Sequence, residues 1–386
     1  MKYDFDKIID RGNTYSLKWD IGGDILPLWV ADMDFACAPA IQKALHERID
    51  RQIYGYTNIL QKDYTDAVCG WFKRRFDWEI DSEHIRYTAG CIQALSFFVT
   101  ILSKPGDKIV IQRPVYYPFT LMVELQGREV SNNPLVMTEN GYEMDFEDLE
   151  KKLADPEAVG MILCSPHNPV GRVWTVEELR RVVDIAKKYN KWIISDEIHC
   201  DLVRKGVKHI PLLKLAPDYA DRIVACTSPS KTFNLAGMQL SDIIIPGEEF
   251  RALWKHQVTG IMHVNVANPL SICAMQAAYN ESEEWLDQLN EYLDENIRFL
   301  SAYIAEKLPK AKVFDCQGTY LVWVDFRAYE RDAQKLEERT QSKAKVYLDD
   351  GYMFGPEGEG FERFNVACPR SILKECVDRL AAEFER

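Results

Sequence analysis

The sequence lacks the features that mark disulfide-rich, metal-clustered and membrane-spanning proteins. Its ten cysteines include no Cys-x-x-Cys pair, so neither a disulfide framework nor a metal site is indicated. No apolar run approaches the length that crosses a bilayer, and acids interrupt the first residues where a signal peptide needs an apolar stretch. We therefore expect a soluble, cytoplasmic protein with no membrane partner, whose cysteines are reduced and largely buried.

The chain also lacks an excess of positive charge. Its 386 residues include 60 Asp or Glu and 47 Lys or Arg, which gives a net charge of −13. This balance disfavours non-specific attraction to nucleic acid and to anionic membranes. No internal repeat, low-complexity tract or long linker is found. With 47% hydrophobic residues the chain can bury a large core, and its length predicts two domains.

Short apolar runs recur through the middle of the chain, and polar residues follow each of them. Thr175 and Glu178 form a capping box ahead of an amphipathic helix between two such runs. The spacing of roughly thirty residues is that of βαβ units, which predicts an α/β fold with a mostly parallel sheet and its polar groups along one edge. The runs that predict buried strands lie at 108–112, 161–164, 192–194 and 223–226.

The two ends of the chain differ in pattern from its middle. A long amphipathic helix is predicted over 282–308, and strands and a last helix follow in the mixed order of an α+β unit. We therefore expect a large α/β domain over 46–280. A smaller α+β domain is expected from 281–386 together with the N-terminal segment 1–45.

A lysine stands just beyond the last of the apolar runs. Lys231 lies close to Ser228 and Ser230, where an open α/β sheet collects its ligands. A lysine with limited solvent can form a Schiff base with pyridoxal phosphate, and neighbouring hydroxyls can bind the phosphate. Taken alone, Ser-Pro-Ser-Lys is more often an ordinary polar turn, so other residues must support the cofactor site.

Other strand ends offer the remaining groups that this cofactor requires. Asp196 can hold the pyridine nitrogen protonated, although a single strand-end aspartate is more often a helix cap. Asn168 is placed to donate to the phenolic oxygen of the ring, whereas Asn-Pro is commonly a turn. Tyr116 can stack on the ring or simply pack in the core.

Backbone amides at a predicted helix start complete the set. Gly90, Cys91 and Ile92 lie where a strand gives way to a helix, and amides in such a place attract anions. Each of these assignments has an ordinary structural alternative. Their joint appearance, in order and at successive strand ends, favours a pyridoxal phosphate site.

These residues resemble those of the fold type I pyridoxal phosphate enzymes, the aspartate aminotransferase superfamily, over nearly the whole chain. Within that superfamily the sequence is most similar to the MalY/PatB-type carbon–sulfur lyases. The segments that carry this narrower likeness are PLWVADMDF at 27–35, DEIHCDL at 196–202, SPSKTFN at 228–234 and FNVACPR at 364–370.

The resemblance implies roles that the residues alone do not indicate. Arg370 is expected to bind the substrate α-carboxylate as a bidentate fork, with Asn168 and Ala31 also contacting the substrate. Tyr56 resembles the tyrosine that reaches the cofactor phosphate of the other subunit, which implies a homodimer with shared active sites. His199 is expected beside the cofactor, where many aminotransferases carry a tyrosine, and it supports the lyase subgroup.

The implied activity is α,β-elimination on a sulfur-containing amino acid such as cystathionine, which releases pyruvate, ammonia and a thiol. Lys231 is expected to remove the Cα proton, and Lys231 or Tyr116 to protonate the leaving sulfur. An aminotransferase that uses the same residues remains open, because the two reactions diverge only after that proton has left. A regulatory binding protein on this fold also remains open, although no DNA-binding module fits before Ile25.

Overall fold

A seven-stranded sheet forms the centre of the computed structural model, which describes residues 2–139 and 141–385. Its strand order is β2-β10-β9-β8-β7-β3-β4. β10 runs antiparallel to both of its neighbours, and the other strand pairs are parallel, so the predicted mostly parallel sheet is confirmed. In chain order the strands span Ile85–Thr88, Lys108–Ile111, Glu129–Asn132, Ala158–Cys164, Trp192–Asp196, Ile223–Thr227 and Ser241–Ile244.

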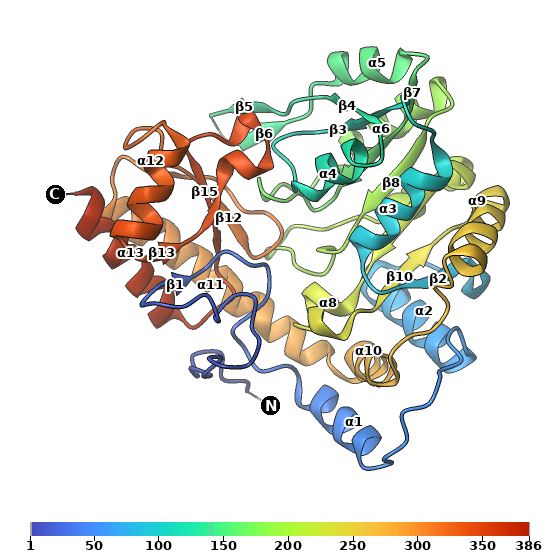
Figure 1. The fold of residues 1–386 in the computed structure, drawn as a ribbon, viewed down its shortest axis with the longest axis horizontal. Helices are drawn as coiled ribbons and strands as arrows, with labels where there is room; N and C mark the ends of the chain where they lie inside the picture. Colours follow the sequence, from blue (N-terminus) through green and yellow to red (C-terminus); the bar gives the residue numbers. More distant parts are fainter. Residues whose placement is uncertain (1, 140, 386) are drawn as a thin grey trace.

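Helices cover both faces of this sheet because its strands are apolar on both sides (Figure 1). Neighbouring strand residues face opposite cores: Ile193 of β8 packs in one buried cluster and Ile194 in the other. On the Ile194 side lie α3 (Cys91–Leu102), α4 (Pro118–Glu124) and α9 (Glu248–Trp254). On the Ile193 side lie α2 (Lys62–Phe76), α5 (Phe146–Ala154), α6 (Val176–Lys188) and α10 (Pro269–Glu281).

A second sheet of four antiparallel strands occupies the C-terminal part of the chain, in the order β11-β12-β15-β14. The 25-residue helix α11 (Glu283–Lys307) runs from the first sheet to the second, as the amphipathic pattern predicts (Figure 1). We propose domain boundaries near residues 45 and 280 on this basis. The strands are Lys312–Val313, Leu321–Asp325, Asp349–Asp350 and Phe361–Asn365, flanked by α12 (Ala333–Glu337) and α13 (Arg370–Phe384).

The N-terminal segment lies against both sheets. β1 (Leu26–Pro27) pairs in parallel with β13 (Val346–Tyr347), and α1 (Pro39–Ile49) packs on α10. Between β1 and α1 runs an irregular stretch, residues 29–35, which we call the strap. The Asp34 amide donates to the carbonyl of Ala367, and the Met33 amide donates to the side chain of Asn234. The strap therefore bridges the C-terminal part of the chain and the large sheet.

Shorter elements fill the connections. The capping box of Thr175 and Glu178 is present at the start of α6, as predicted. The other strands and α-helices are β5 (Val136–Thr138), β6 (Gly141–Glu143), α7 (Leu212–Leu215) and α8 (Pro229–Thr232). The 3₁₀ and π turns are η1 (Ser82–His84), η2 (Pro217–Arg222), η3 (Ala236–Met238), η4 (Lys255–Ile261), η5 (Glu338–Lys343), η6 (Gly351–Phe354) and η7 (Pro356–Gly358).

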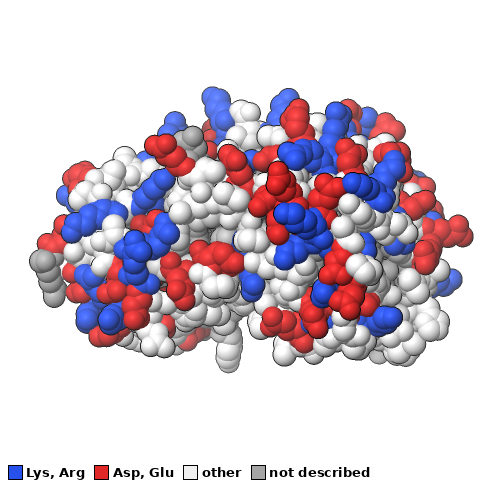
Figure 2. Space-filling model, turned by 90° about the horizontal axis from the view of Figure 1, so that it is seen from above, with Lys and Arg blue, Asp and Glu red and all other residues white. Residues whose placement is uncertain are grey.

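Acidic and basic side chains are interspersed over the surface. Figure 2 shows blue and red side chains alternating across the face seen from above, so the net charge of −13 is spread and not gathered in one patch on that face. Among the helices of the described chain, none is long and apolar enough to span a bilayer.

Candidate active site

A cavity of about 180 Å³ opens at the carboxyl edge of the large sheet. Its walls come from the ends of parallel strands, the start of α3, the helix α8 and the strap, which is the usual place for ligands in open α/β sheets. The structure brings together at this cavity most of the residues that the sequence singles out. They are Ala31, Gly90, Cys91, Ile92, Tyr116, Asn168, Asp196, His199, Ser230 and Lys231.

Lys231 projects into this cavity from α8. Its Nζ donates a hydrogen bond to the carbonyl of Ala31 at 2.6 Å. Burial lowers the pKa of the Lys231 amine to about 8, and the carboxylate of Asp32 partly opposes that shift. About a tenth of the amine is therefore uncharged at pH 7, which suits a nucleophile or a general base.

Asp196 ends β8 and is buried in the wall of the same cavity. One of its carboxylate oxygens accepts from the amide of Ile198 at 3.2 Å, and no ion pair to it is found in the described part of the chain. Burial raises the pKa of Asp196 to about 7, against the lowering effect of the Ile198 amide. A buried carboxylate is costly without a cationic partner, and a protonated pyridine nitrogen is such a partner.

The start of α3 offers an anion site in the same cavity. The N-cap residue, Gly90, has no side chain to satisfy the first amides of the helix, so they are available to a phosphate. Ser230 lines the cavity beside them. Ser228 lies deeper: its hydroxyl accepts from the Ser230 amide at 3.0 Å and donates to the Leu240 carbonyl at 2.7 Å. A phosphate contact from Ser228 therefore stays a prediction.

Tyr116, Asn168 and His199 border the middle of the cavity. The amide of Tyr116 donates to the carbonyl of Asn168 at 3.1 Å, which ties two strand ends together. Burial raises the pKa of Tyr116 to about 12, so its hydroxyl stays protonated. Burial, reinforced by the charge of Lys231, lowers the pKa of His199, so its ring is neutral. Within the described chain its Nδ1 is buried without a hydrogen-bond partner, which leaves it for a ligand.

The prediction that Arg370 binds in this cavity is wrong. Its Nη2 forms an ion pair with Glu295 at 2.9 Å, and its Nε donates to the side chain of Asn296 at 3.2 Å. It lines a separate surface hollow with Tyr3 and Phe5. Arg370 is the first residue of α13, and that helix packs on α11, so its side chain is directed to α11 and away from the cavity.

Another arginine, Arg363 on β15, contacts Asn168, a residue that lines the cavity. Its side chain is 2% exposed. Nη1 donates to Oδ1 of Asn168 at 2.9 Å, and Nη2 donates to the carbonyl of Trp29 at 2.9 Å. Asp349 forms an ion pair with the same guanidinium from the neighbouring strand. In the described chain its Nε has no hydrogen-bond partner, so donor capacity remains for a carboxylate.

The sequence around Arg363 holds a signal for its burial, because Phe361, Phe364 and Val366 stand beside it in a short predicted strand. An arginine in such a strand is expensive to bury unless it has a polar role. Strand alternation also places Arg363 on the same face as Asn365, whose side chain binds the strap. A test of each arginine for burial would have favoured Arg363 over Arg370.

Tyr56 lies apart from the cavity on an outer loop. Its side chain is 97% exposed, and Ile53 and Tyr54 beside it are exposed as well. The hydroxyl of Thr57 donates to the carbonyl of Ala267 at 2.7 Å and fastens this loop to the segment before α10. A contact between Tyr56 and a second subunit remains a prediction.

Comparison with known proteins identifies the family. Residues 23–380 match the family model described as aminotransferase class I and II. The chain is 43% identical over 386 residues to the cystathionine beta-lyase PatB of Bacillus subtilis (strain 168), a match that covers 98% of this chain and 99% of that protein.

Two solved structures are similar over the whole chain. Cystalysin from Treponema denticola, which contains a pyridoxal 5'-phosphate cofactor, has a TM-score of 0.96 and 36% identity, with 100% of this chain and 99% of that one covered. The PLP-bound C-S lyase from Staphylococcus hominis has a TM-score of 0.94 and 34% identity, with the same coverage. With the lysine at the carboxyl edge of the large sheet, these matches show that the chain belongs to the aminotransferase class I and II family.

Proposed function

We propose that the protein is a pyridoxal phosphate-dependent carbon–sulfur lyase. It converts cystathionine or a related cysteine S-conjugate, with one water, into pyruvate, ammonia and a thiol. The observation that carries this proposal is the buried amine of Lys231, which shares one cavity with Asp196 and Asn168. The names of the similar proteins, a cystathionine beta-lyase and a C-S lyase, support elimination as the class of reaction.

The cavity fits pyridoxal phosphate at each polar part of that molecule. Lys231 is the residue to hold its aldehyde carbon, Asp196 to pair with its ring nitrogen, and the first amides of α3 to hold its phosphate. His199, whose Nδ1 has no hydrogen-bond partner among residues 2–139 and 141–385, and Asn168 also line the cavity. When bound, the cofactor supplies an electron sink for the charge that develops at the substrate Cα.

Arg363 takes the role of carboxylate binder. Asn168 and the carbonyl of Trp29 fix its guanidinium before a substrate arrives, so little orientation is lost on binding. Asp349 balances its charge in the free protein. Carboxylate binding at Arg363 restricts the substrate to orientations in which its Cα lies within the cavity that Lys231 lines.

Two side chains handle the protons of the reaction. Lys231, with its pKa near 8, removes the Cα proton in its uncharged form. Tyr116 keeps its own proton at neutral pH and can donate a hydrogen bond to the leaving sulfur, while Lys231 returns the proton that it has taken. The water oxygen ends in pyruvate, and the amino nitrogen leaves as ammonia.

We also infer a homodimer that acts in the cytoplasm. Ile53, Tyr54 and Tyr56 are exposed on the loop that Thr57 fastens to Ala267, and the segment before α10 adds further exposed apolar side chains. Apolar surface of this extent is typical of a self-association face. All ten cysteines are free, which suits a reducing compartment.

A substrate panel tests the activity. The purified protein is given cystathionine, cystine and S-methylcysteine, each with and without a keto-acid acceptor, and pyruvate and free thiol are measured. A lyase releases both products without the acceptor. Strict dependence on the acceptor, with no thiol released, would make the protein an aminotransferase.

A further inference from the structure

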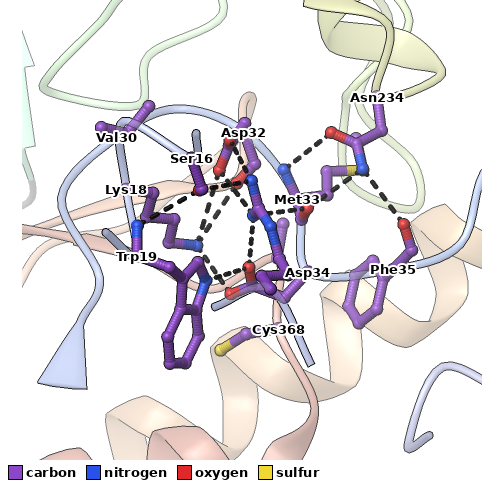
Figure 3. A network of polar contacts seen from close by, with 12 residues as sticks. Ser16, Lys18, Trp19, Val30, Asp32, Met33, Asp34, Phe35, Asn234 and Cys368 are labelled. Atoms are coloured by element: carbon purple, nitrogen blue, oxygen red, sulfur yellow. Dashed lines mark hydrogen bonds and ion pairs between the residues drawn. The ribbon is translucent and has the colours of Figure 1, made fainter. Parts of the chain in front are cut away.

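Side chains from distant parts of the chain hold the strap, residues 29–35, by its carbonyl groups. Figure 3 shows one of them, Asn234, with its hydrogen bonds to Met33 and Phe35. Arg363 and Asn365 reach it from β15, and Asn234 reaches it from the segment after α8. The hydrogen bonds run from Arg363 to Trp29 (2.9 Å), from Asn365 to Val30 and Asp32 (2.6 Å each), and from Asn234 to Met33 (3.0 Å) and Phe35 (3.1 Å). Because so many of its carbonyl groups accept hydrogen bonds from these side chains, the irregular backbone of the strap is held in one path.

The Ala31 carbonyl occupies the middle of this path and faces the cavity. It accepts from the Lys231 amine at 2.6 Å and from the Tyr320 hydroxyl at 2.9 Å. The path of the strap therefore sets where the free amine of Lys231 rests.

A group of four charged residues holds the other side of the strap. We call Arg11, Lys18, Asp32 and Asp34 the outer cluster; Figure 3 labels the last three. Arg11 pairs with Asp32 at 2.8 Å and with Asp34 at 2.6 Å, while Lys18 pairs with Asp34 at 2.7 Å and more distantly with Asp32 at 3.8 Å. Lys18 is fully buried and Asp34 is 5% exposed, so solvent screens their pair poorly, whereas Arg11 and Asp32 are 21% and 20% exposed.

We propose that the outer cluster is a positioning device for the reaction, in which Arg11 balances the charge of Asp32 and so controls how tightly the Lys231 amine holds its proton. This inference rests on the proposed role of Lys231 and deepens it. Asp32 directly follows Ala31, and it is the first charge that opposes the effect of burial on the pKa of Lys231. The other groups that face the amine are Asp196, Cys91, Arg363 and His199.

Charge substitutions with opposite signs separate this role from a merely structural one. Arg11→Gln leaves Asp32 less neutralised, so the Lys231 amine should hold its proton to higher pH. Asp32→Asn removes the negative charge, so the amine should lose its proton at lower pH. Loosening of the strap alone would move both variants in the same direction.

The readout is the pH dependence with which cofactor-free protein captures added pyridoxal phosphate, followed by the visible absorbance of the bound cofactor. Only the uncharged amine condenses with the aldehyde, with loss of water, so the midpoint of the pH profile reports the amine. We expect shifts of roughly half a pH unit or more, upward for Arg11→Gln and downward for Asp32→Asn.

Two control variants accompany these measurements. Arg11→Lys keeps the positive charge and should restore most of the wild-type midpoint. Arg379→Gln removes another tie of the N-terminal segment, the hydrogen bond from Arg379 to the Asp24 carbonyl at 2.9 Å, and should leave the midpoint unchanged. If Asp32→Asn fails to fold, the comparison of Arg11→Gln with Arg11→Lys alone tests whether the positive charge of Arg11 sets the midpoint.

Midpoint shifts of opposite sign in Arg11→Gln and Asp32→Asn support the positioning role of the outer cluster. Shifts of the same sign, or unshifted midpoints, overturn it. Wild-type protein that failed to capture the cofactor would overturn the proposed function as well, because the inference depends on Lys231. Normal capture with unshifted midpoints would overturn the positioning role alone.

Discussion

Arg363 and Arg370 stand seven positions apart and differ in what surrounds them. Arg363 is buried between Asn168 and Asp349, whereas Arg370 forms a partly exposed pair with Glu295. A buried guanidinium that binds a carboxylate through charge-assisted hydrogen bonds contributes about 1.5–3 kcal/mol, and an exposed pair contributes little. The two arginines are therefore a matched pair for substitution.

Lysine at each position tests which arginine binds the substrate. Arg363→Lys removes the planar fork and should raise KM for cystathionine by about 10-fold to 100-fold. Arg370→Lys should change KM by less than about 3-fold. Steady-state kinetics of both variants measures this, and a larger effect at Arg370 would reject the assignment of Arg363.

Removal of the Lys231 amine should abolish cofactor attachment and greatly reduce turnover. Lys231→Ala removes both the attachment point of the cofactor and the base, so kcat should fall by at least about 100-fold. Borohydride should no longer fix the cofactor to the chain, as mass spectrometry would show. Lys62→Ala, at an exposed lysine of α2, is the control and should retain both properties. Turnover that survived Lys231→Ala would contradict the mechanism.

Single residues differed in how far the sequence could predict them. Lys231, Asp196 and Asn168 each lie within five residues of the end of an apolar run, so a local pattern places them near strand ends, and the structure brings them to one cavity. The position of Arg363 depends on how β15 pairs with β12 and β14, which are separate in sequence. No local pattern contains that pairing, so the motif at 364–370 favours the nearby Arg370.

At the scale of elements, the pairing of β14 with β15 sets two charged pairs side by side. Asp349 lies opposite Arg363, and Asp350 lies opposite Glu362. The first pair faces the site. In the second pair both members are acids: burial, followed by the nearby carboxylates, raises the pKa of Asp350 to about 7 and raises that of Glu362 as well.

The raised pKa of Asp350 predicts a pH-dependent stability. In the unfolded chain this carboxyl titrates near pH 4, whereas in the folded chain it holds its proton to about pH 7. The contribution of this carboxyl to the free energy of unfolding is therefore highest below about pH 4 and falls as the pH rises through about 7. Asp350→Asn cannot ionise and avoids that fall. We expect it to match the wild type at pH 4 and to be more stable at pH 8 by roughly 1 kcal/mol or more.

Urea unfolding of the cofactor-loaded protein at the two pH values measures this difference. Asp378→Asn is the control, because the Lys374 contact lowers the pKa of Asp378 and its removal should give no gain at pH 8. An equal effect of Asp350→Asn at both pH values would show that the carboxyl ionises freely in the folded protein.

Periodic elements were predictable from sequence, and irregular ones were not. The stripe of leucines over 282–308 predicted α11, and the capping box predicted the start of α6. The strap has no repeating hydrogen-bond pattern of its own. Its path is set by Asn234 and Asn365, which lie about 200 and 330 residues away in sequence, so no local signal describes it.

At the scale of the whole molecule, the proposed homodimer predicts complementation between two defective chains. Tyr56→Ala should weaken cofactor retention in the partner's site, and Lys231→Ala disables its own site. In a mixed dimer one site carries both changes and the other carries neither. Equal amounts of the two variants, unfolded and refolded together, should therefore recover about a quarter of the wild-type activity.

Size-exclusion chromatography of the mixture provides the control for this experiment. A dimeric mixture without recovered activity would mean that each site is complete within one chain.

The fold class itself was predictable, since βαβ spacing and the family motifs extend over most of the chain, and the family match confirms it. The contact of Tyr56 with a second subunit is predicted only by the family resemblance, because the sequence of one chain does not show what an exposed side chain contacts in a dimer.

The product balance of cystathionine turnover without any keto acid tests elimination most directly. We expect equal amounts of pyruvate, ammonia and thiol for the cystathionine consumed, since elimination needs only water. Cystathionine that stayed intact until a keto acid was added, and then lost its amino group without releasing thiol, would contradict it.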